Sequence, residues 1–207
     1  MDSNINTVID IGANIGEFTF IFSELFPNAY IYAFEPLPDC FNQLEKRTKN
    51  MRNIKIFNFA LGSTEGELKL HKSSWHPASS FREMGDLHKQ NYPHSSESDD
   101  LIVRIKKLDD IFKKESLTNN IFIKMDVQGF EDEVIKGGPN IFKNAKVVVV
   151  ESSYQKLYDN EPLFDGIYSL LKPLGFEFRG SLKQSVSKSD ESFLQADCIF
   201  IKRNNNV

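Results

Sequence analysis

The hydrophobic pattern of the chain alternates between short apolar runs and stretches with helical periodicity, which is typical of an α/β protein. The first run, Thr7 to Ile11, is apolar and mostly β-branched except for Asp10, as expected of a strand buried on both faces. From Gly16 onward, apolar residues recur at helical spacing at Phe18, Ile21, Phe22, Leu25 and Phe26. The sequence therefore predicts a strand and a helix joined by a short turn.

The alternation continues along the rest of the chain. Further strands are expected at Tyr30 to Phe34, Ile54 to Leu61, Glu67 to His71, Leu101 to Leu108, Ile121 to Met125 and Ala145 to Val150. Helices are expected at Asp39 to Arg47, Phe130 to Ile135 and Leu163 to Leu171, with a short helix opened by Asp109 and Asp110. A closing antiparallel pair is expected from Phe176 to Phe178 and Asp197 to Ile201. This order predicts an α/β fold with a doubly wound, mostly parallel sheet and functional residues at the carboxyl ends of the strands.

One long polar segment, residues 72–100, interrupts the pattern as an insertion or loop. Such a stretch inside a compact domain is usually either a functional loop or disordered. We expect residues 72–84 to be ordered beside the functional site and residues 88–100 to be mobile. The candidate site residues in the ordered part are Trp75, His76, Ser79 and Ser80. Trp75 is an equally good candidate for a hydrophobic contact that only holds the loop in place.

The composition is that of a single globular domain covering residues 1–207. Its 25 Lys and Arg against 29 Asp and Glu give a net charge of −4, which disfavours nucleic acid as a partner. No apolar run approaches the roughly 18 residues needed to cross a bilayer, and the N-terminus lacks the basic and apolar regions of a signal peptide. Cys40 and Cys198 lie far apart without metal-site spacing, so we expect both thiols to be reduced. Together these features predict no membrane partner and a cytoplasmic location.

The turn after the first strand has the pattern Asp10-x-Gly12-x-x-x-Gly16. Without Cβ atoms, the two glycines let the backbone turn sharply and let a ligand approach the loop, which also contains Ala13 and Asn14. If the loop is aligned with a dinucleotide-binding Gly-x-Gly-x-x-Gly motif, a Glu takes the place of the third glycine. Its negative charge would repel the pyrophosphate of a dinucleotide. The carboxylate of Asp10 instead suits a cationic ligand, and S-adenosylmethionine carries an ammonium and a sulfonium group. The alternative is an ordinary strand-to-helix turn.

A second carboxylate, Glu35, follows the next predicted strand. Its position is close to the roughly 20-residue spacing at which a ribose-binding acid is expected in a nucleotide-binding βαβ unit. Pro36 cannot continue a central strand, so Glu35 is expected to be held where the strand stops. The alternative for Glu35 is an acidic residue that only stabilises the start of the following helix. Together, the glycine loop and Glu35 favour a nucleoside-containing cofactor.

Two more acids, Asp126 and Glu151, follow predicted strands that we expect to be neighbours in the sheet. Their charges must be balanced, either by a divalent ion with an added oxygen from Ser152 or by protonation or hydrogen bonding of one acid. We favour the arrangement without metal, in which Asp126 or His76 is the general base and Glu151 faces the acceptor. Simpler roles for Asp126 are the cap of the next helix or an ion-pair partner of Lys124.

Six stretches carry a family resemblance. They are VIDIGANIG at residues 8–16, AFEP at 33–36, NFALG at 58–62, LDD at 108–110, IKMDVQGFE at 123–131 and VVE at 149–151. In this order they resemble the FkbM-type family of S-adenosylmethionine-dependent methyltransferases. The resemblance implies a seven-stranded, Rossmann-like class I methyltransferase fold. It also implies O-methylation of a small-molecule hydroxyl acceptor, such as a sugar or a natural product.

The resemblance also assigns site residues by position. Those implied to bind the cofactor are Asp10, Gly12, Ala13, Asn14, Gly16, Glu35, Pro36, Ala60, Leu61 and Asp126. Ala60 and Leu61 would lie beside the adenine, and Asp126 near the transferable methyl. The first strand begins almost at the N-terminus, where the family usually has a covering segment, so a homo-oligomer or a partner chain would cover the cofactor.

Two other functions remain open. A nucleotide-dependent oxidoreductase would share the fold class, but the register of the glycines argues against it. A catalytically inactive cofactor-binding homologue or partner subunit would keep the fold without turnover. The presence of Asp10, Glu35 and Asp126 together disfavours this second alternative.

Overall fold

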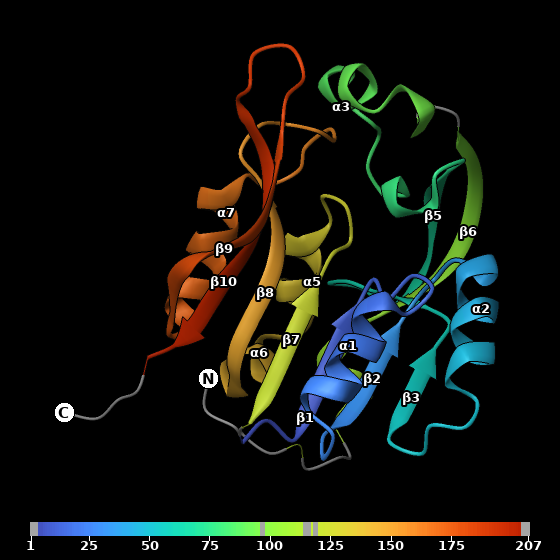
Figure 1. Cartoon of the computed structure of the whole chain (residues 1–207), viewed down its shortest axis with the longest axis vertical. Helices are drawn as coiled ribbons and strands as arrows, with labels where there is room; N and C mark the ends of the chain where they lie inside the picture. The colour runs from blue at the N-terminus through green and yellow to red at the C-terminus, as the bar shows by residue number, and fades with distance from the viewer. Residues whose placement is uncertain (1–3, 96–97, 114–116, 118–119, 204–207) are drawn as a thin grey trace.

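The computed structural model describes residues 4–95, 98–113, 117 and 120–203. A seven-stranded sheet with the order β3-β2-β1-β7-β8-β10-β9 forms its centre (Figure 1). The strands are β1 (Thr7–Ile11), β2 (Tyr30–Phe34), β3 (Ile54–Phe57), β7 (Ile121–Met125), β8 (Ala145–Ser153), β9 (Phe176–Val186) and β10 (Phe193–Lys202). The pairs from β3 to β8 are parallel, and β10 pairs antiparallel with β8 and β9. The predicted fold class is confirmed.

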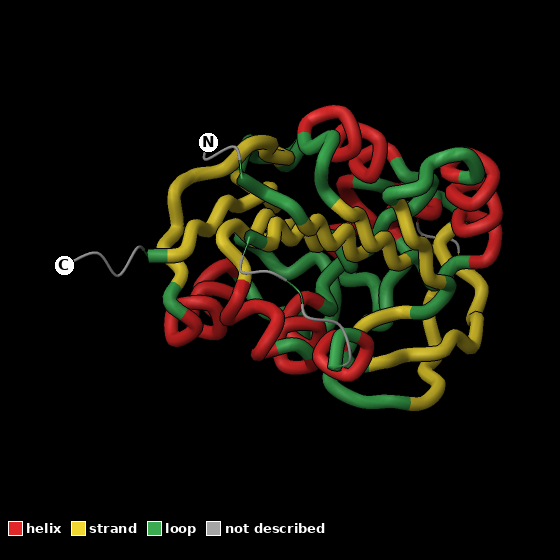
Figure 2. The backbone as a smooth tube through the Cα atoms, turned by 90° about the horizontal axis from the view of Figure 1, so that it is seen from below, coloured by secondary structure: helices red, strands yellow, loops and turns green. Residues whose placement is uncertain are grey.

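Helices cover both faces of this sheet (Figure 2). On one face lie α1 (Glu17–Leu25) and α2 (Pro38–Thr48), and on the other lie α5 (Glu131–Gly137), α6 (Pro139–Asn144) and α7 (Phe164–Leu171), which continues into η3 (Lys172–Leu174). Successive strand residues point to opposite faces. Val8 therefore packs with Phe22 of α1, whereas Ile9 packs in the larger core with Ile167 of α7. None of the helices in the described part of the chain combines the length and hydropathy needed to cross a membrane.

A smaller sheet with the order β4-β6-β5 stands beyond the carboxyl ends of β2 and β3 (Figure 1). It consists of β4 (Ala60–Leu61), β5 (Gly66–Ser73) and β6 (Ser98–Lys106), and α4 (Leu108–Ile111) follows it. Between β5 and β6 the chain forms η1 (His76–Ala78), α3 (Asp86–Asn91) and η2 (Pro93–Ser95). This part of the chain leans over the edge of the main sheet at which the predicted site residues lie.

The structure corrects the predicted strand Ile54 to Leu61. The strand β3 ends at Phe57, and β4 pairs with β6 in the smaller sheet. The side-chain amide of Asn58 donates hydrogen bonds to the backbone oxygens of Glu35 (3.0 Å) and Pro36 (3.2 Å). These bonds turn the chain away from the main sheet, a local interaction that hydrophobic alternation cannot reveal.

The prediction that residues 88–100 are mobile is also wrong for the residues that the structure describes. They form most of α3, η2 and the start of β6, while residues 96 and 97 lie outside the described part. His88 is only 3% exposed, and its ring packs against the rings of Tyr92 and Tyr158. Aromatic packing therefore orders a segment whose composition is polar.

Two smaller predictions need correction. The predicted strand Leu101 to Leu108 ends at Lys106, because buried Leu108 belongs to α4 and packs in the main core. The N-cap position of α4 is Lys107 rather than an Asp. The Asp109 carboxylate instead accepts the N–H groups of Asn140 (3.1 Å) and Ile141 (3.0 Å) in α6, a helix that the sequence pattern did not predict.

Candidate active site

Three central strands of the main sheet end in register. Ile11 of β1 pairs with Phe34 of β2 on one side and with Met125 of β7 on the other. The next residues along the chain are Gly12, Glu35 and Asp126. The strand order reverses at β1, and open α/β sheets bind ligands at such a switch point. Parallel pairing thus brings together three predicted site residues from distant parts of the sequence.

The glycine loop is shaped by its contacts with the neighbouring strand ends. Gly12 has φ +80°, and a Cβ on it would lie 1.9 Å from the backbone oxygen of Asp126. Gly16 has φ +91° and packs against Leu44 of α2. Both positions therefore need glycine for the backbone itself. Gly12 lines the cavity described below together with Ala13 and Asn14, whereas Gly16 does not.

Glu35 is held by the glycine loop and by its own helix. Its Oε2 accepts the backbone N–H of Asn14 (2.8 Å), and its Oε1 accepts that of Leu37 (2.8 Å). The side chain is buried, and burial raises the pKa of Glu35 to about 7 despite these two bonds. Each oxygen retains a lone pair for a further donor. Glu35 is therefore held in one position, with lone pairs left for a further donor.

Asp10 lies beneath the loop rather than in the cavity. Its Oδ2 accepts a hydrogen bond from the Thr19 hydroxyl of α1 (2.6 Å), and its Oδ1 has no hydrogen-bond partner within the described residues. Full burial raises the pKa of Asp10, while the charge of Lys124 on the neighbouring strand opposes that rise. The structure thus places Asp10 as a buried acid under the loop that does not line the cavity described below.

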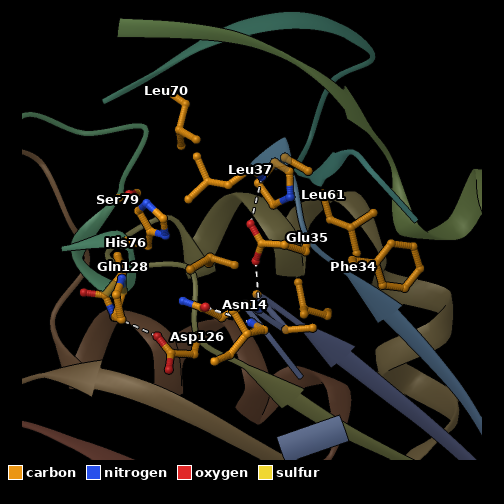
Figure 3. A pocket seen from close by; sticks show the side chains of 18 of the residues that line it. Asn14, Phe34, Glu35, Leu37, Leu61, Leu70, His76, Ser79, Asp126 and Gln128 are labelled. Atoms are coloured by element: carbon orange, nitrogen blue, oxygen red, sulfur yellow. Dashed lines mark hydrogen bonds between the residues drawn. The ribbon is translucent and has the colours of Figure 1, made fainter. Parts of the chain in front are cut away.

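A cavity of about 490 Å³ opens above these strand ends (Figure 3). Its volume lies in the range of small-molecule and cofactor sites. The predicted residues that line it are Gly12, Ala13, Asn14, Glu35, Pro36, Ala60, Leu61, Trp75, His76, Ser79 and Asp126. Phe34 and Phe59 add apolar surface on the side of Ala60 and Leu61. Most of the predicted cofactor-binding residues thus surround one space.

Asp126 forms an ion pair with a lysine from inside the same strand. Lys124 Nζ lies 2.8 Å from Asp126 Oδ2, and the lysine side chain is 3% exposed against 28% for the aspartate. Burial alone would raise the pKa of Asp126, but the Lys124 charge and its hydrogen bond lower it below its usual value. The ammonium also lies 4.6 Å from the centre of the Phe18 ring. Asp126 is thus ionised at neutral pH and open to the cavity.

Glu151 occupies a different position from the one predicted. The strand β8 continues to Ser153, so Glu151 lies within it, paired with Asp197 of β10. Its oxygens accept bonds from the side chains of Gln128 (2.5 Å) and Gln195 (2.7 Å). Burial and the nearby Asp126 charge raise the pKa of Glu151 well above its usual value. Glu151 stands behind Gln128 and does not line the cavity.

The segment 72–84 contributes the outer wall of the cavity, as expected. Trp75 lines the cavity, is 43% exposed at its rim and contacts the His94 ring edge-on, with 5.2 Å between ring centres. His76 Nδ1 lies 3.2 Å from the buried Cys40 thiol of α2, a thiol whose pKa burial and the nearby Glu35 raise to about 12. Ser79 also faces the cavity. Ser80 points away from it, and its hydroxyl donates to the Gln128 backbone oxygen (2.5 Å).

The site contains three residues that the sequence interpretation missed or undervalued. Lys124 was considered only as a simple partner of Asp126, although a lysine inside a fully buried strand is an unusual signal. Gln128 stands in one of the stretches that carry the family resemblance but is assigned no role by it, and Tyr158 carries no sequence signal. The two carboxylates whose charges were expected to need balancing, Asp126 and Glu151, are bridged by the Gln128 amide. Within the described ranges, no three His, Cys, Asp or Glu side chains are grouped as metal ligands.

Comparison with known proteins decides the family. Residues 10–178 match the model of the methyltransferase FkbM domain. This chain belongs to the FkbM methyltransferase family. The FkbM assignment identifies the protein as a methyltransferase and removes the oxidoreductase alternative.

Two curated relatives show the range of this FkbM similarity. The chain is 28% identical over 171 residues to the 2-O-methyltransferase NoeI of Sinorhizobium fredii, with 79% of this chain and 70% of the relative covered. It is 27% identical over 143 residues to the hexuronic acid methyltransferase AglP of Haloferax volcanii, with 69% and 54% covered. Among solved structures, TehB from Haemophilus influenzae has a TM-score of 0.51 at 10% identity, covering 97% of this chain and 58% of that one. That likeness concerns the fold alone.

Proposed function

We propose that this FkbM-family protein is an S-adenosylmethionine-dependent O-methyltransferase whose acceptor is a hydroxyl of a sugar-like small molecule. One observation carries the proposal. An ionised carboxylate, Asp126, faces the same cavity as the hydroxyl-accepting Glu35, and both follow strands that end in register. The arrangement supplies a cofactor site and a proton acceptor within one space.

The residues present fit the cofactor. Glu35 offers a free lone pair on each oxygen to the two ribose hydroxyls, and the apolar wall at Ala60 and Leu61 suits an adenine ring. The loop of Gly12 and Asn14 would hold the amino-acid half, above the buried carboxylate of Asp10. When bound, the cofactor supplies a methyl group made electrophilic by the sulfonium.

Asp126 would act on the acceptor. A hydroxyl must lose its proton as it is methylated, and a base of suitable position typically contributes ~10²–10⁴-fold in rate. Asp126 has one oxygen bonded to Lys124 and the other to Gln128, which leaves further lone pairs for a hydroxyl. His76 is the second candidate, but its Nδ1 is already engaged with Cys40, so only Nε2 is available.

The acceptor class rests on the rim of the cavity and on the relatives. The exposed indole of Trp75 presents a flat apolar face with a polar edge, which suits the ring of a sugar. The names of NoeI and AglP describe a 2-O-methyltransferase and a hexuronic acid methyltransferase. We therefore take sugar hydroxyls as the first acceptors to test.

The proposal is tested in two steps. Calorimetry should detect S-adenosylhomocysteine binding and no comparable binding of NAD. The protein is then incubated with S-adenosylmethionine and a panel of monosaccharides, uronic acids and glycosides, and the products are analysed by mass spectrometry for an added methyl. Cofactor binding without methylation of any acceptor would instead support an inactive cofactor-binding homologue.

We expect Trp75→Ala to raise the KM for the acceptor roughly two- to tenfold, which corresponds to the ~0.5–1.5 kcal/mol of an aromatic contact. Affinity for S-adenosylhomocysteine should stay the same. Tyr30→Ala is the matched control, because Tyr30 is an exposed aromatic residue at the opposite ends of the strands. An unchanged KM in Trp75→Ala would place the acceptor elsewhere.

We expect methylation to continue in the presence of EDTA. The Asp126 carboxylate is already balanced by the Lys124 ammonium and the Gln128 amide, so no divalent ion is needed to offset its charge. Initial rates with and without EDTA measure this directly. A loss of activity that added Mg²⁺ restores would contradict the proposed arrangement without metal.

A further inference from the structure

We infer that Gln128 is a positioning residue, whose carboxamide is held between Tyr158 and Glu151 and fixes the Asp126 carboxylate in the cavity. The inference rests on the proposed function, since it assigns a role relative to the base. Gln128 itself lines the cavity from the loop between β7 and α5 (Figure 3).

The carboxamide uses its donors and its acceptor on three different partners. Its Nε2 donates to Asp126 Oδ1 (2.7 Å) and to Glu151 Oε2 (2.5 Å). Its Oε1 accepts from the Tyr158 hydroxyl (3.0 Å). The reversed amide would turn its oxygen toward the ionised Asp126 carboxylate, which only accepts hydrogen bonds, so the orientation with Nε2 on Asp126 is the favourable one.

The backbone of Gln128 is held in an uncommon conformation. Its φ is +54°, in the left-handed region that a side chain with a Cβ rarely adopts. The Ser80 hydroxyl donates to its backbone oxygen, and Tyr158, 2% exposed, also lies 3.1 Å from the Ala78 oxygen. Strained residues persist where surrounding contacts enforce them, which is common at functional sites. Contacts from two distant segments therefore set the position of one amide.

The amide matters because Asp126 is surrounded mainly by acids. The groups that act on it electrostatically are Asp10 on β1, Glu35 after β2, Lys124 on β7, Glu131 on α5, Glu151 on β8, Tyr158 in the loop after β8 and Asp197 on β10. Lys124 is the cation that offsets them in this group. A neutral donor on Asp126 Oδ1 favours the ionised form, so its removal should raise the pKa of Asp126. As the pH falls, Asp126 would then become protonated, and so stop acting as a base, at a higher pH than in the wild-type protein.

Gln128→Met tests this inference, because it keeps the length of the side chain and removes the amide. The pKa of Asp126 is measured by NMR in protein with ¹³C-labelled aspartate carboxyls, assigned with Asp126→Asn. We expect an upward shift of about one pH unit, the equivalent of one hydrogen bond to a charged group. Gln184→Met, the same change on the exposed part of β9, is the control and should give no shift.

Tyr158→Phe is the second variant, because it leaves Gln128 in place and removes only the hydroxyl that orients it. The Asp126 pKa should move in the same direction by a smaller amount. In both variants the acid limb of kcat/KM for the acceptor, measured at saturating cofactor, should shift with the pKa of Asp126, while S-adenosylhomocysteine affinity at neutral pH stays constant. An unchanged Asp126 pKa in both variants would overturn the inference. The titration needs no acceptor, so a wild-type protein that methylates nothing would overturn the proposed function separately.

Discussion

Replacing Asp126 with Asn should lower kcat by about 10²- to 10⁴-fold, the usual contribution of a general base. Asn keeps the shape of the side chain and can still bond to Gln128, but it cannot accept a proton from the acceptor. Lys124 loses its ion-pair partner and retains the charge of the buried Asp10 beside it. Steady-state kinetics with the acceptor identified by the methylation screen measure the loss.

The comparison variant is Asp165→Asn, which makes the same change on the exposed first turn of α7. It should retain wild-type activity. S-adenosylhomocysteine affinity should be nearly equal in all three proteins, because Asp126 is assigned to the acceptor. Full turnover in Asp126→Asn would end its role as base and make His76 the leading candidate.

Replacing Glu35 with Ala should weaken S-adenosylhomocysteine binding roughly tenfold to a hundredfold. Hydrogen bonds to a charged group are worth ~1.5–3 kcal/mol, which corresponds to this range of Kd. The substitution also removes the acceptor of the Asn14 and Leu37 N–H groups, so the loop that holds the amino-acid half should loosen. Calorimetry on folded protein, with thermal unfolding as a check, gives the change.

Glu24→Ala serves as the control for Glu35→Ala, because Glu24 is an exposed residue of α1. Glu35→Gln separates charge from shape, since Gln can accept from one ribose hydroxyl but carries no charge. An affinity that does not change in Glu35→Ala would contradict the ribose role.

Cofactor affinity should also depend on pH near neutrality. Burial raises the pKa of Glu35 to about 7 in the free protein, and ribose hydroxyls donate to the carboxylate form. Binding would therefore favour the ionised state and release a proton at low pH, so Kd should rise as the pH falls through about 7. The same titration of Glu35→Gln should be flat in this range. A wild-type Kd that is constant between pH 5 and 8 would contradict the assignment.

The sequence predicts which residues meet at the ends of the central strands, because these signals are local. A strand end, a glycine loop and an acid after the next strand lie within residues 7–36, and parallel pairing then brings Asp126 to the same edge without further information. The glycines are needed for reasons that the sequence cannot show. Gly12 avoids the backbone of Asp126, and Gly16 avoids Leu44.

The other half depends on contacts between residues far apart in the chain. Gln128 meets Tyr158, thirty residues later, and Ser80, forty-eight residues earlier. Hydrophobic alternation predicts a strand that ends before Glu151, but pairing with the antiparallel strand β10 extends β8 to Ser153. Such effects come from tertiary packing and leave no periodic signal.

The short strand β4 closes a large excursion of the chain at its base. Ala60 and Leu61 pair directly with Ile105 and Lys106, so the whole excursion between them leaves and returns at adjacent backbone positions. It carries Trp75, which forms part of the cavity wall. Under the proposed function, exchange of residues within this excursion would alter the acceptor, provided that the contacts of Ala78 and Ser80 with Tyr158 and Gln128 are kept.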